Sequence, residues 1–320
     1  MQKRKLGKLD EWITPLGFGC AAIGGFYTRA GQVASRGKVD DDESIRAIHA
    51  ALAAGIQLFD VGNIYGAGHA ERMLGRALVG RRHEAILHIK FGASFDEVTR
   101  AQIDYDGEIT PAMIRRSLEG SLRRLRTDVI DIFQFQRGNY PIEQLPEIID
   151  VLHALINEGK IRAYCYGTRN IEQLRPFVEA PHCATVITNH NVLMDAPDLL
   201  DFLAANGVAL LAGVPLFMGL LAGSYSAKTK FDTEDLRANW NLDAGCLAEV
   251  RQQVELLRPF LTSGGRTMVQ GALAWLWAWH EITIPVVGFR TAVQVEQSAK
   301  ALQHGMLDQE TMNTIANAKK

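Results

Sequence analysis

Three ionisable side chains stand at or near the ends of apolar runs and could form a reactive centre. Asp60 follows the apolar residues at positions 56–59, Tyr65 comes five positions later, and Lys90 lies inside the apolar run Ala85–Phe91. An isolated buried charge is very costly, so Lys90 needs a partner, and we expect Asp60 to be that partner. A tyrosine beside this lysine is predicted to have a lowered pKa and to exchange a proton near neutral pH. A structural ion pair next to a core tyrosine is the alternative.

His88 is a further polar residue that the sequence places near this centre. His88 precedes Lys90 by two positions, so strand alternation points both side chains to the same face. We expect His88 to be a core histidine one layer beneath Lys90, in preference to a substitute acid–base group. His190 and Asn191, at the end of another apolar run, are further pocket candidates.

The elements that must position these residues follow a regular alternation. Eight short apolar runs alternate with longer segments of helical period, which predicts a parallel sheet with right-handed crossovers. No G-x-G-x-x-G turn follows the first run, which disfavours a doubly wound open sheet. The predicted fold class is therefore α/β, a (β/α)8 TIM barrel, with residues 1–320 as a single domain. The predicted strands are Leu16–Cys20, Gln57–Val61, Ala85–Phe91, Val129–Gln136, Ile161–Gly167, Thr185–His190, Val208–Val214 and Thr283–Phe289.

Turn and capping residues help to bound the helices between these strands. Thr110-Pro111 is typical of a helix start, while Gly55 and Gly159 each follow a predicted helix end. The predicted helices are Asp42–Ala54, Ala70–Val79, Pro111–Arg124, Leu145–Glu158, Asn170–Val178, Pro197–Ala205 and Thr267–His280.

Several segments fall outside the alternation. Residues 1–14 are predicted to form an N-terminal hairpin that plugs one end of the barrel, and residues 308–318 a C-terminal helix. Residues 217–265 form a predicted insertion between strands seven and eight, with an extra helix at Ala244–Phe260. The connections Phe26–Val39 and Ala93–Gly107 are also long. In a barrel such loops lie at the C-terminal face, where they shape a site.

Bulk properties exclude some classes of partner. The chain has 320 residues, a formal net charge of −2 and 47 % hydrophobic residues, with no apolar stretch of membrane-spanning length. We therefore expect no nucleic-acid or membrane partner and a cytoplasmic location. The four cysteines show no ligand spacing, and no metal site is predicted.

Longer motifs resemble those of the aldo-keto reductase superfamily over about residues 16–302. The run FDVGNIYG from Phe59 to Gly66, with ERMLGRAL from Glu71 to Leu78, resembles that family's signature. The segment IKFG from Ile89 to Gly92 and the run SLEGSLRRLRTDVID from Ser117 to Asp131 resemble two further family motifs. The strand-seven segment is most similar to the branch of aldose and pyridoxal dehydrogenases.

The resemblance implies carbonyl reduction with NADP(H). In that reading Tyr65 protonates the carbonyl oxygen, Lys90 lowers the pKa of Tyr65, and Asp60 holds Lys90. Gln136 occupies the position of the usual fourth catalytic residue, a histidine; glutamine can donate a hydrogen bond but cannot relay a proton near pH 7. The cofactor-binding positions implied by the resemblance are Gly167, Thr168, Thr188, Gly213, Pro215, Leu216, Gly219, Gly288, Arg290, Gln294, Gln297 and Ser298.

The two ends of the implied cofactor site resemble the family's motifs to different degrees. At Gly167, Thr168 and Thr188 the residues that usually bind the nicotinamide carboxamide are replaced, and Gln297 and Ser298 replace those that usually hold adenine. Arg290 beside a helix start is a sound anion site and favours the 2′-phosphate of NADP. A surface arginine is the alternative for that position.

The predicted function is therefore an NADP-dependent oxidoreductase that interconverts a carbonyl and an alcohol on a small or sugar-like substrate. One alternative is an enzyme of the same fold that performs non-redox elimination or isomerisation beside a carbonyl, with a degraded nicotinamide site. Another alternative is a cofactor-sensing regulatory or interaction subunit, because the same fold can serve proteins with different functions.

Overall fold

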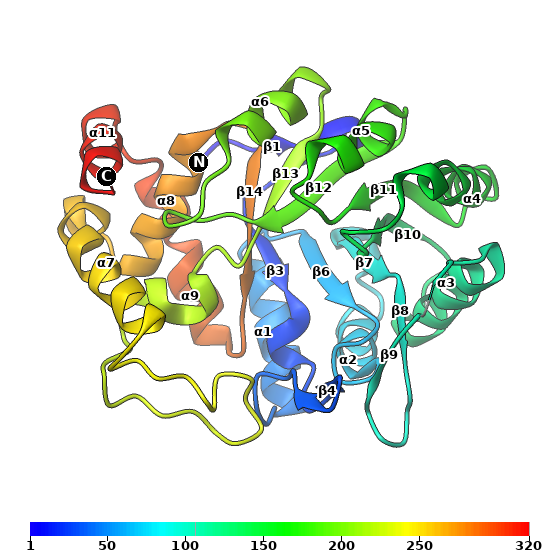
Figure 1. Ribbon diagram of the computed structural model, residues 1–320, viewed down its shortest axis with the longest axis horizontal. Coiled ribbons are helices and arrows are strands. Elements are labelled where there is room, and N and C mark those ends of the chain that lie inside the picture. Colours follow the sequence, from blue (N-terminus) through cyan, green and yellow to red (C-terminus); the bar gives the residue numbers. More distant parts are fainter. Residues whose placement is uncertain (106, 320) are drawn as a thin grey trace.

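Eight parallel strands close into a barrel in the computed structural model, which describes residues 1–105 and 107–319. Residue 106 of the predicted connection Ala93–Gly107 and residue 320 of the predicted domain lie outside that description. Helices surround the barrel (Figure 1). The predicted (β/α)8 fold is confirmed. In barrel order the strands are β3 (Gly17–Gly19), β6 (Leu58–Gly62), β7 (Ile86–Phe91), β10 (Ile130–Phe135), β11 (Ile161–Tyr166), β12 (Cys183–Asn189), β13 (Ala209–Gly213) and β14 (Thr283–Gly288).

Several helices begin where a capping side chain accepts a hydrogen bond from the first turn. Asp40 caps α1, Thr110 caps α3, and Thr267 forms a capping box with Gln270 at α8. Two helices that follow β14, α9 and α10, were not among the predicted ranges. The helices are α1 (Asp41–Ala53), α2 (His69–Ala77), α3 (Pro111–Leu125), α4 (Leu145–Asn157), α5 (Ile171–Glu179), α6 (Pro197–Ala205), α7 (Cys246–Leu261), α8 (Met268–Trp279), α9 (Ala292–Ala299), α10 (Ala301–His304) and α11 (Gln309–Ala318).

The barrel is filled at one end by apolar side chains and closed there by the N-terminal segment. Leu58, Ile86 and Ile132 belong to this interior cluster, together with Leu6, which follows the short strand β1 (Arg4–Lys5), and Ile13 of the short strand β2 (Trp12–Ile13). Between these strands, a Cβ on Gly7 would lie 1.8 Å from the carbonyl oxygen of Ala184. The other end of the barrel is thereby left to polar side chains.

Long connections gather at the carboxyl ends of the strands. Two of them contain short hairpins, β4 (Thr28–Arg29) with β5 (Gln32–Val33), and β8 (Ala93–Phe95) with β9 (Gln102–Asp104). The segment after β13 reaches across to the first connection, where Arg36 pairs with Asp235 in an isolated antiparallel bridge. Figure 1 shows this segment passing from the α7 side to β4. Short 3-10 helices are η1 (Gly7–Leu9), η2 (Cys20–Ile23), η3 (Arg82–Glu84), η4 (Ile142–Gln144), η5 (Phe217–Ala222) and η6 (Ser263–Gly265).

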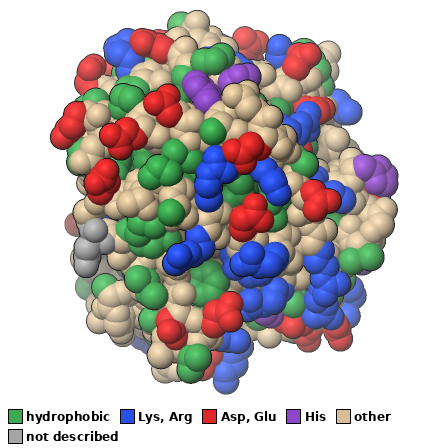
Figure 2. Space-filling view, turned by 90° about the vertical axis from the view of Figure 1, so that its right-hand side faces the viewer, with side chains coloured by type: hydrophobic (Ala, Val, Ile, Leu, Met, Phe, Trp, Pro, Cys, Tyr) green, Lys and Arg blue, Asp and Glu red, His purple; other side chains and the backbone are tan. Residues whose placement is uncertain are grey.

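The outer surface over α3 and α4 carries charges of both signs. Figure 2 views the molecule from this side and shows Lys and Arg side chains interspersed with Asp and Glu. Arg115 of α3 forms an ion pair with Glu158 after α4, at 2.6 Å. Among the described residues, no helix combines the length and the apolar character that crossing a membrane requires.

Candidate active site

A buried carboxylate joins two basic side chains near the open end of the barrel. Asp60 of β6 forms an ion pair with Lys90 of the neighbouring strand β7, and the same oxygen Oδ1 lies 2.7 Å from Nδ1 of His88. All three side chains are buried. Burial by itself raises the pKa of Asp60, but the charge of Lys90 and the hydrogen bond from His88 lower it to about 2. Burial opposes the charge of Lys90, yet Asp60 raises the pKa of Lys90 above its ordinary value.

His88 lies in the barrel interior, as the alternation of β7 predicts. Burial lowers the pKa of its imidazole, so the ring is neutral at pH 7. Because ionised Asp60 can only accept hydrogen bonds, the proton of the neutral ring is assigned to Nδ1. Nε2 is then an acceptor, and it has no hydrogen-bond partner among the described residues. His88 therefore supports Asp60 from beneath and does not face the cavity.

Tyr65 follows β6 and packs beside Lys90. The ammonium nitrogen of Lys90 lies 5.3 Å from the centroid of the Tyr65 ring. Burial raises the pKa of Tyr65 and the charge of Lys90 lowers it, with burial the larger effect, so the pKa lies above the ordinary value. The predicted lowering of the Tyr65 pKa is therefore wrong in its net direction. The predicted proximity of the two side chains is present.

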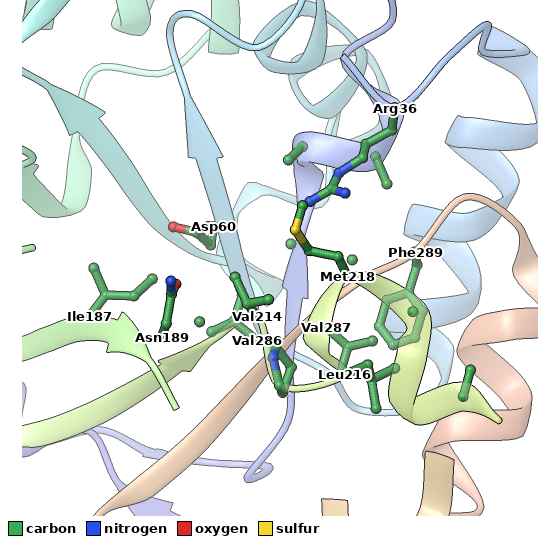
Figure 3. Close-up of a pocket in the computed structure, with 18 of the residues that line it drawn as sticks. Arg36, Asp60, Ile187, Asn189, Val214, Leu216, Met218, Val286, Val287 and Phe289 are labelled. Carbon is green, nitrogen blue, oxygen red and sulfur yellow. The ribbon is translucent and has the colours of Figure 1, made fainter. Parts of the chain in front are cut away.

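A single cavity of about 960 Å³ collects these groups. Asp60, Tyr65, Lys90 and Gln136 line it, and Figure 3 shows Asp60 across the cavity from Phe289. The predicted cofactor-binding residues line the same cavity: Gly167, Thr168, Thr188, Gly213, Pro215, Leu216, Gly219, Gly288, Arg290, Gln294, Gln297 and Ser298. The structure thus brings together positions that are up to 238 residues apart, from 60 to 298.

The end of the cavity near β11 and β12 includes a glycine, Gly167, that lies close to Gln134. A Cβ on Gly167 would lie 2.5 Å from Nε2 of Gln134, so a larger residue here would require the Gln134 side chain to shift. The hydroxyl of Thr168 donates to the carbonyl of Gly138 at 3.2 Å or to Gln173 at 3.3 Å. Its oxygen also accepts from the backbone N–H of Asn170 at 3.3 Å, so the protein itself engages both the proton and the oxygen of this hydroxyl.

The turn after β13 is held in an uncommon backbone conformation. Val214, Phe217 and Met218 have φ values of 51°, 46° and 54°, in the left-handed region. For Val214 in particular this is costly, since its branched Cβ disfavours positive φ. Val214, Leu216 and Met218 line the cavity and are labelled in Figure 3. The strained backbone conformation therefore lies in a segment that forms part of the cavity wall.

The end of the cavity near β14 carries Arg290, whose guanidinium already binds the protein. Its Nη1 donates to the carbonyl of Arg36 at 2.8 Å, and its Nη2 donates to the carbonyl of Lys38. Glu43 accepts a hydrogen bond from the N–H of Ala292 at 2.8 Å, in the first turn of α9. Part of the predicted anion site is therefore occupied by the protein's own groups.

Many residues that line the cavity lie outside the predicted set, and Gln134 and Arg36 are two polar examples. Gln134 is buried, its Oε1 has no partner among the described residues, and it lies two positions before Gln136 on β10. Strand alternation from Gln136 could have identified it. Arg36 comes from the connection after β3 and carries no sequence signal, because its neighbours Asp235 and Arg237 are about 200 positions away. His190 is buried against Trp275 and, like Asn191, is not among the lining residues.

The geometry is suited to moving a proton at a carbonyl oxygen. Tyr65 is a neutral phenol at pH 7 and lines the cavity beside a permanent positive charge, which stabilises the phenolate that forms on proton transfer. The carboxylate of Asp60 balances the positive charge of Lys90. No cluster of three or more potential metal ligands occurs within residues 1–105 and 107–319.

Comparison with known proteins identifies a family for this chain. A family model described as the aldo/keto reductase family matches residues 15–320. The NADH-specific methylglyoxal reductase of Escherichia coli (strain K12) is 27 % identical, covering 96 % of this chain and 95 % of that protein. The aldo-keto reductase yakc of Schizosaccharomyces pombe, whose name carries NADP(+), is 25 % identical, covering 95 % of this chain and 88 % of that protein.

A solved structure gives the same result in three dimensions. The glycerol dehydrogenase of Gluconobacter oxydans superposes with a TM-score of 0.84 and 28 % identity, covering 99 % of this chain and 94 % of that chain. The similarity therefore extends over the barrel and its connections together.

Proposed function

Since this chain belongs to the aldo/keto reductase family, an oxidoreductase family that binds a nicotinamide cofactor, we propose that it interconverts a carbonyl and an alcohol with NADP(H). Tyr65 acts as the general acid in reduction and as the general base in oxidation. The substrate is a small or sugar-like carbonyl compound, and the enzyme acts in the cytoplasm.

One observation carries the proposal. Tyr65 is partly exposed to the cavity, while its neighbours Lys90 and Asp60 are buried behind it. A phenol that faces a cavity of about 960 Å³, with an ammonium group behind it, can donate a proton to a bound oxygen and tolerate the resulting charge. We expect a dinucleotide to bind in the same cavity along the lining residues from Gly167 to Ser298.

The residues of the chain divide the work of proton transfer. When bound, the nicotinamide supplies or accepts hydride at the substrate carbon. Tyr65 gives its proton to the carbonyl oxygen, Lys90 stabilises the phenolate, and Asp60 fixes Lys90 through their ion pair. Gln136 donates a hydrogen bond that orients the carbonyl, and it carries no proton relay.

Preference for NADP(H) over NAD(H) rests on Arg290. Two of its five N–H groups are used by the carbonyls of Arg36 and Lys38, and the remaining donors can bind a 2′-phosphate near the start of α9. The Escherichia coli relative named for NADH shows that the family model alone does not decide this preference. We therefore expect tighter binding of NADPH than of NADH, and a loss of that difference in Arg290→Gln.

Two variants test the catalytic roles. We expect Tyr65→Phe and Lys90→Met to lower kcat for NADPH-dependent aldehyde reduction by about 100- to 10,000-fold, the range for general acid catalysis. Fluorescence titration should show NADPH affinity close to that of the parent protein, because neither change alters the residues assigned to the cofactor. Tyr105→Phe, a tyrosine outside the cavity lining, is the matched control. Turnover at the parent rate by either variant would contradict the assigned roles.

The non-redox alternative gains no support from the relatives. Both curated relatives described above are named as reductases, and the solved structure is named as a dehydrogenase.

A further inference from the structure

The cavity that contains Tyr65 carries an excess of positive charge. Among the described residues, its lining contains one carboxylate, Asp60, which is already paired with Lys90. The other charged residues of the lining are the arginines Arg36, Arg169, Arg237 and Arg290. A cavity lined by one sign of charge attracts ligands of the opposite sign.

Three of these arginines are engaged by the protein itself. Arg237 binds Asp235 at 2.6 Å and the hydroxyl of Tyr225 at 2.8 Å. Arg169 donates to the carbonyl of Asp195 at 2.9 Å. Arg290 donates to the carbonyls of Arg36 and Lys38.

The guanidinium of Arg36 is different. Its Nη1 is buried and has no hydrogen-bond partner among the described residues. The nearest acid, Asp235, uses both carboxylate oxygens for the Arg237 side chain, at 2.8 Å to Nε and 2.6 Å to Nη2. A buried donor without a partner costs free energy, so such a group points to a ligand that completes it.

The backbone holds Arg36 firmly over the cavity. Its residue pairs with Asp235 in a bridge, Gly37 donates to the carbonyl of Glu234 at 3.2 Å, and Leu236 donates to that of Ser35 at 2.9 Å. Figure 3 shows the Arg36 side chain extending from the rim toward Met218. A side chain mounted on fixed backbone is preorganised for binding.

Arg36 also lies within electrostatic range of the reactive phenol. Burial lowers the pKa of the Arg36 guanidinium, as does the charge of Arg237, while Asp235, Tyr27 and Tyr65 raise it. The guanidinium remains charged at pH 7. A group bound to Arg36 would therefore sit in the same cavity as a carbonyl held at Tyr65.

We propose that Arg36 forms an anion-binding subsite of this cavity, which takes a carboxylate or phosphate group beside Tyr65. The inference deepens the proposed function and rests on it, because the anion has two sources there. It is either an acidic group on the carbonyl substrate or the diphosphate of the dinucleotide. Arginine binds both through the same charge-assisted hydrogen bonds.

Arg36→Gln in the full chain separates the two sources. The first measurement is the ratio of kcat/KM for succinic semialdehyde over that for its neutral methyl ester. The second is the dissociation constant of NADPH from fluorescence quenching. A drop of about 10- to 100-fold in the ratio, the range for losing a hydrogen bond to a charged group, assigns the subsite to the substrate. A similar weakening of NADPH binding assigns it to the diphosphate.

Two control variants distinguish the loss of a specific contact at Arg36 from a general loss of charge or of folding. Lys38 lies two positions after Arg36, and its side chain is not part of the cavity lining. Lys38→Gln therefore removes a nearby positive charge and should keep the kcat/KM ratio and the NADPH affinity of the parent protein. Arg36→Lys keeps the charge and should recover part of the lost ratio or affinity. If a folded Arg36→Gln protein shows the parent ratio and the parent NADPH affinity, the subsite does not exist.

A further titration needs no turnover. If the parent protein reduces neither aldehyde, the proposed function fails, and calorimetric binding of succinate and inorganic pyrophosphate still tests the subsite. Weaker binding of either anion to Arg36→Gln supports it, and equal binding to both proteins overturns it.

Discussion

At the scale of single residues, the proton affinity of Tyr65 is set by two opposing influences. Burial favours the neutral phenol, and the charge of Lys90 favours the phenolate. Asp60 weakens the influence of Lys90 because it neutralises much of that charge at close range. Tyr65 is therefore protonated, and able to donate its proton, throughout the neutral pH range. Lys90 still stabilises the phenolate when it forms during proton transfer.

The pH dependence of turnover follows from this direction. Reduction needs the protonated phenol, which exists below its pKa, so we expect kcat for reduction to be constant from about pH 6 to 9 and to fall above about pH 10. Oxidation needs the phenolate, so its kcat should rise by roughly tenfold per pH unit over the same range. Steady-state rates in both directions measure this. A decline in reduction centred near pH 7 or 8 would show that the pKa is lowered instead.

His88 adds a second residue-level constraint on the same carboxylate. Asp60 Oδ1 accepts from both Lys90 and His88, so the position of the ion pair is fixed from beneath as well as from the side. A neutral imidazole can do this without adding charge to the barrel interior, where an additional charge would be costly.

At the scale of elements, close contact between helices depends on small residues at particular positions. Helix α8 packs on α7 at Gly271, where a Cβ would lie 1.8 Å from the carbonyl oxygen of Leu261. The clash is with backbone, which a rotamer change cannot relieve. The same helix pair closes the cluster around Trp275 and Leu257 behind β13 and β14.

We expect Gly271→Ala to lower the free energy of unfolding by about 1–3 kcal/mol, the usual cost of overpacking. Urea denaturation measures it. Gly120→Ala in α3 is the matched control, because there the nearest atom is a side-chain nitrogen of Arg124 at 3.0 Å and not a backbone atom. That control should lose less stability than Gly271→Ala, since the Arg124 side chain, which is ion-paired with Glu71, can shift more readily than backbone, and alanine favours a helix interior over glycine by roughly 0.5–1 kcal/mol. Equal stability of Gly271→Ala and the parent would show that α7 can move away freely.

At the scale of the whole molecule, connections from opposite ends of the sequence join over the cavity. Ser35 after β3 donates its hydroxyl proton to the carbonyl of Glu234 at 2.6 Å, and Arg290 after β14 binds the carbonyls of residues 36 and 38. Three connections thus stabilise one another, and each is held where a ligand in the cavity would meet it.

Ser35→Ala should loosen this junction without unfolding the barrel. Loss of the buried hydrogen bond is expected to speed amide hydrogen exchange of Gly37 and Leu236 by roughly tenfold, while exchange in the barrel strands stays slow. Mass-spectrometric exchange on the intact protein measures both. Ser226→Ala, at an exposed serine in the connection after β13 that also contains Leu236, should leave these amides unchanged. Unaltered exchange in Ser35→Ala would mean that the backbone bridge alone holds the junction.

The sequence by itself determined the barrel and much of its cavity. Strand alternation placed Lys90 and His88 on one face, and apolar periodicity with capping residues located nine predicted helices to within one or two positions. These are local properties, since the period of a strand or helix is set by neighbouring residues. The helix α10 and the two outer hairpins were not among the predicted elements, and α9 was expected only as a helix start beside Arg290, because these segments are short and weakly periodic.

Only the tertiary structure decided how the charges balance. The pKa of Tyr65 depends on the depth of burial and on how fully Asp60 neutralises Lys90, and neither can be read from residue types. The guanidinium of Arg290 donates hydrogen bonds to carbonyls that lie about 250 positions away in the sequence. Nη1 of Arg36 is buried without a partner among the described residues, in a junction with residues about 200 positions away. Electrostatic effects depend on distance in space and on local solvent, whereas the sequence reports distance along the chain.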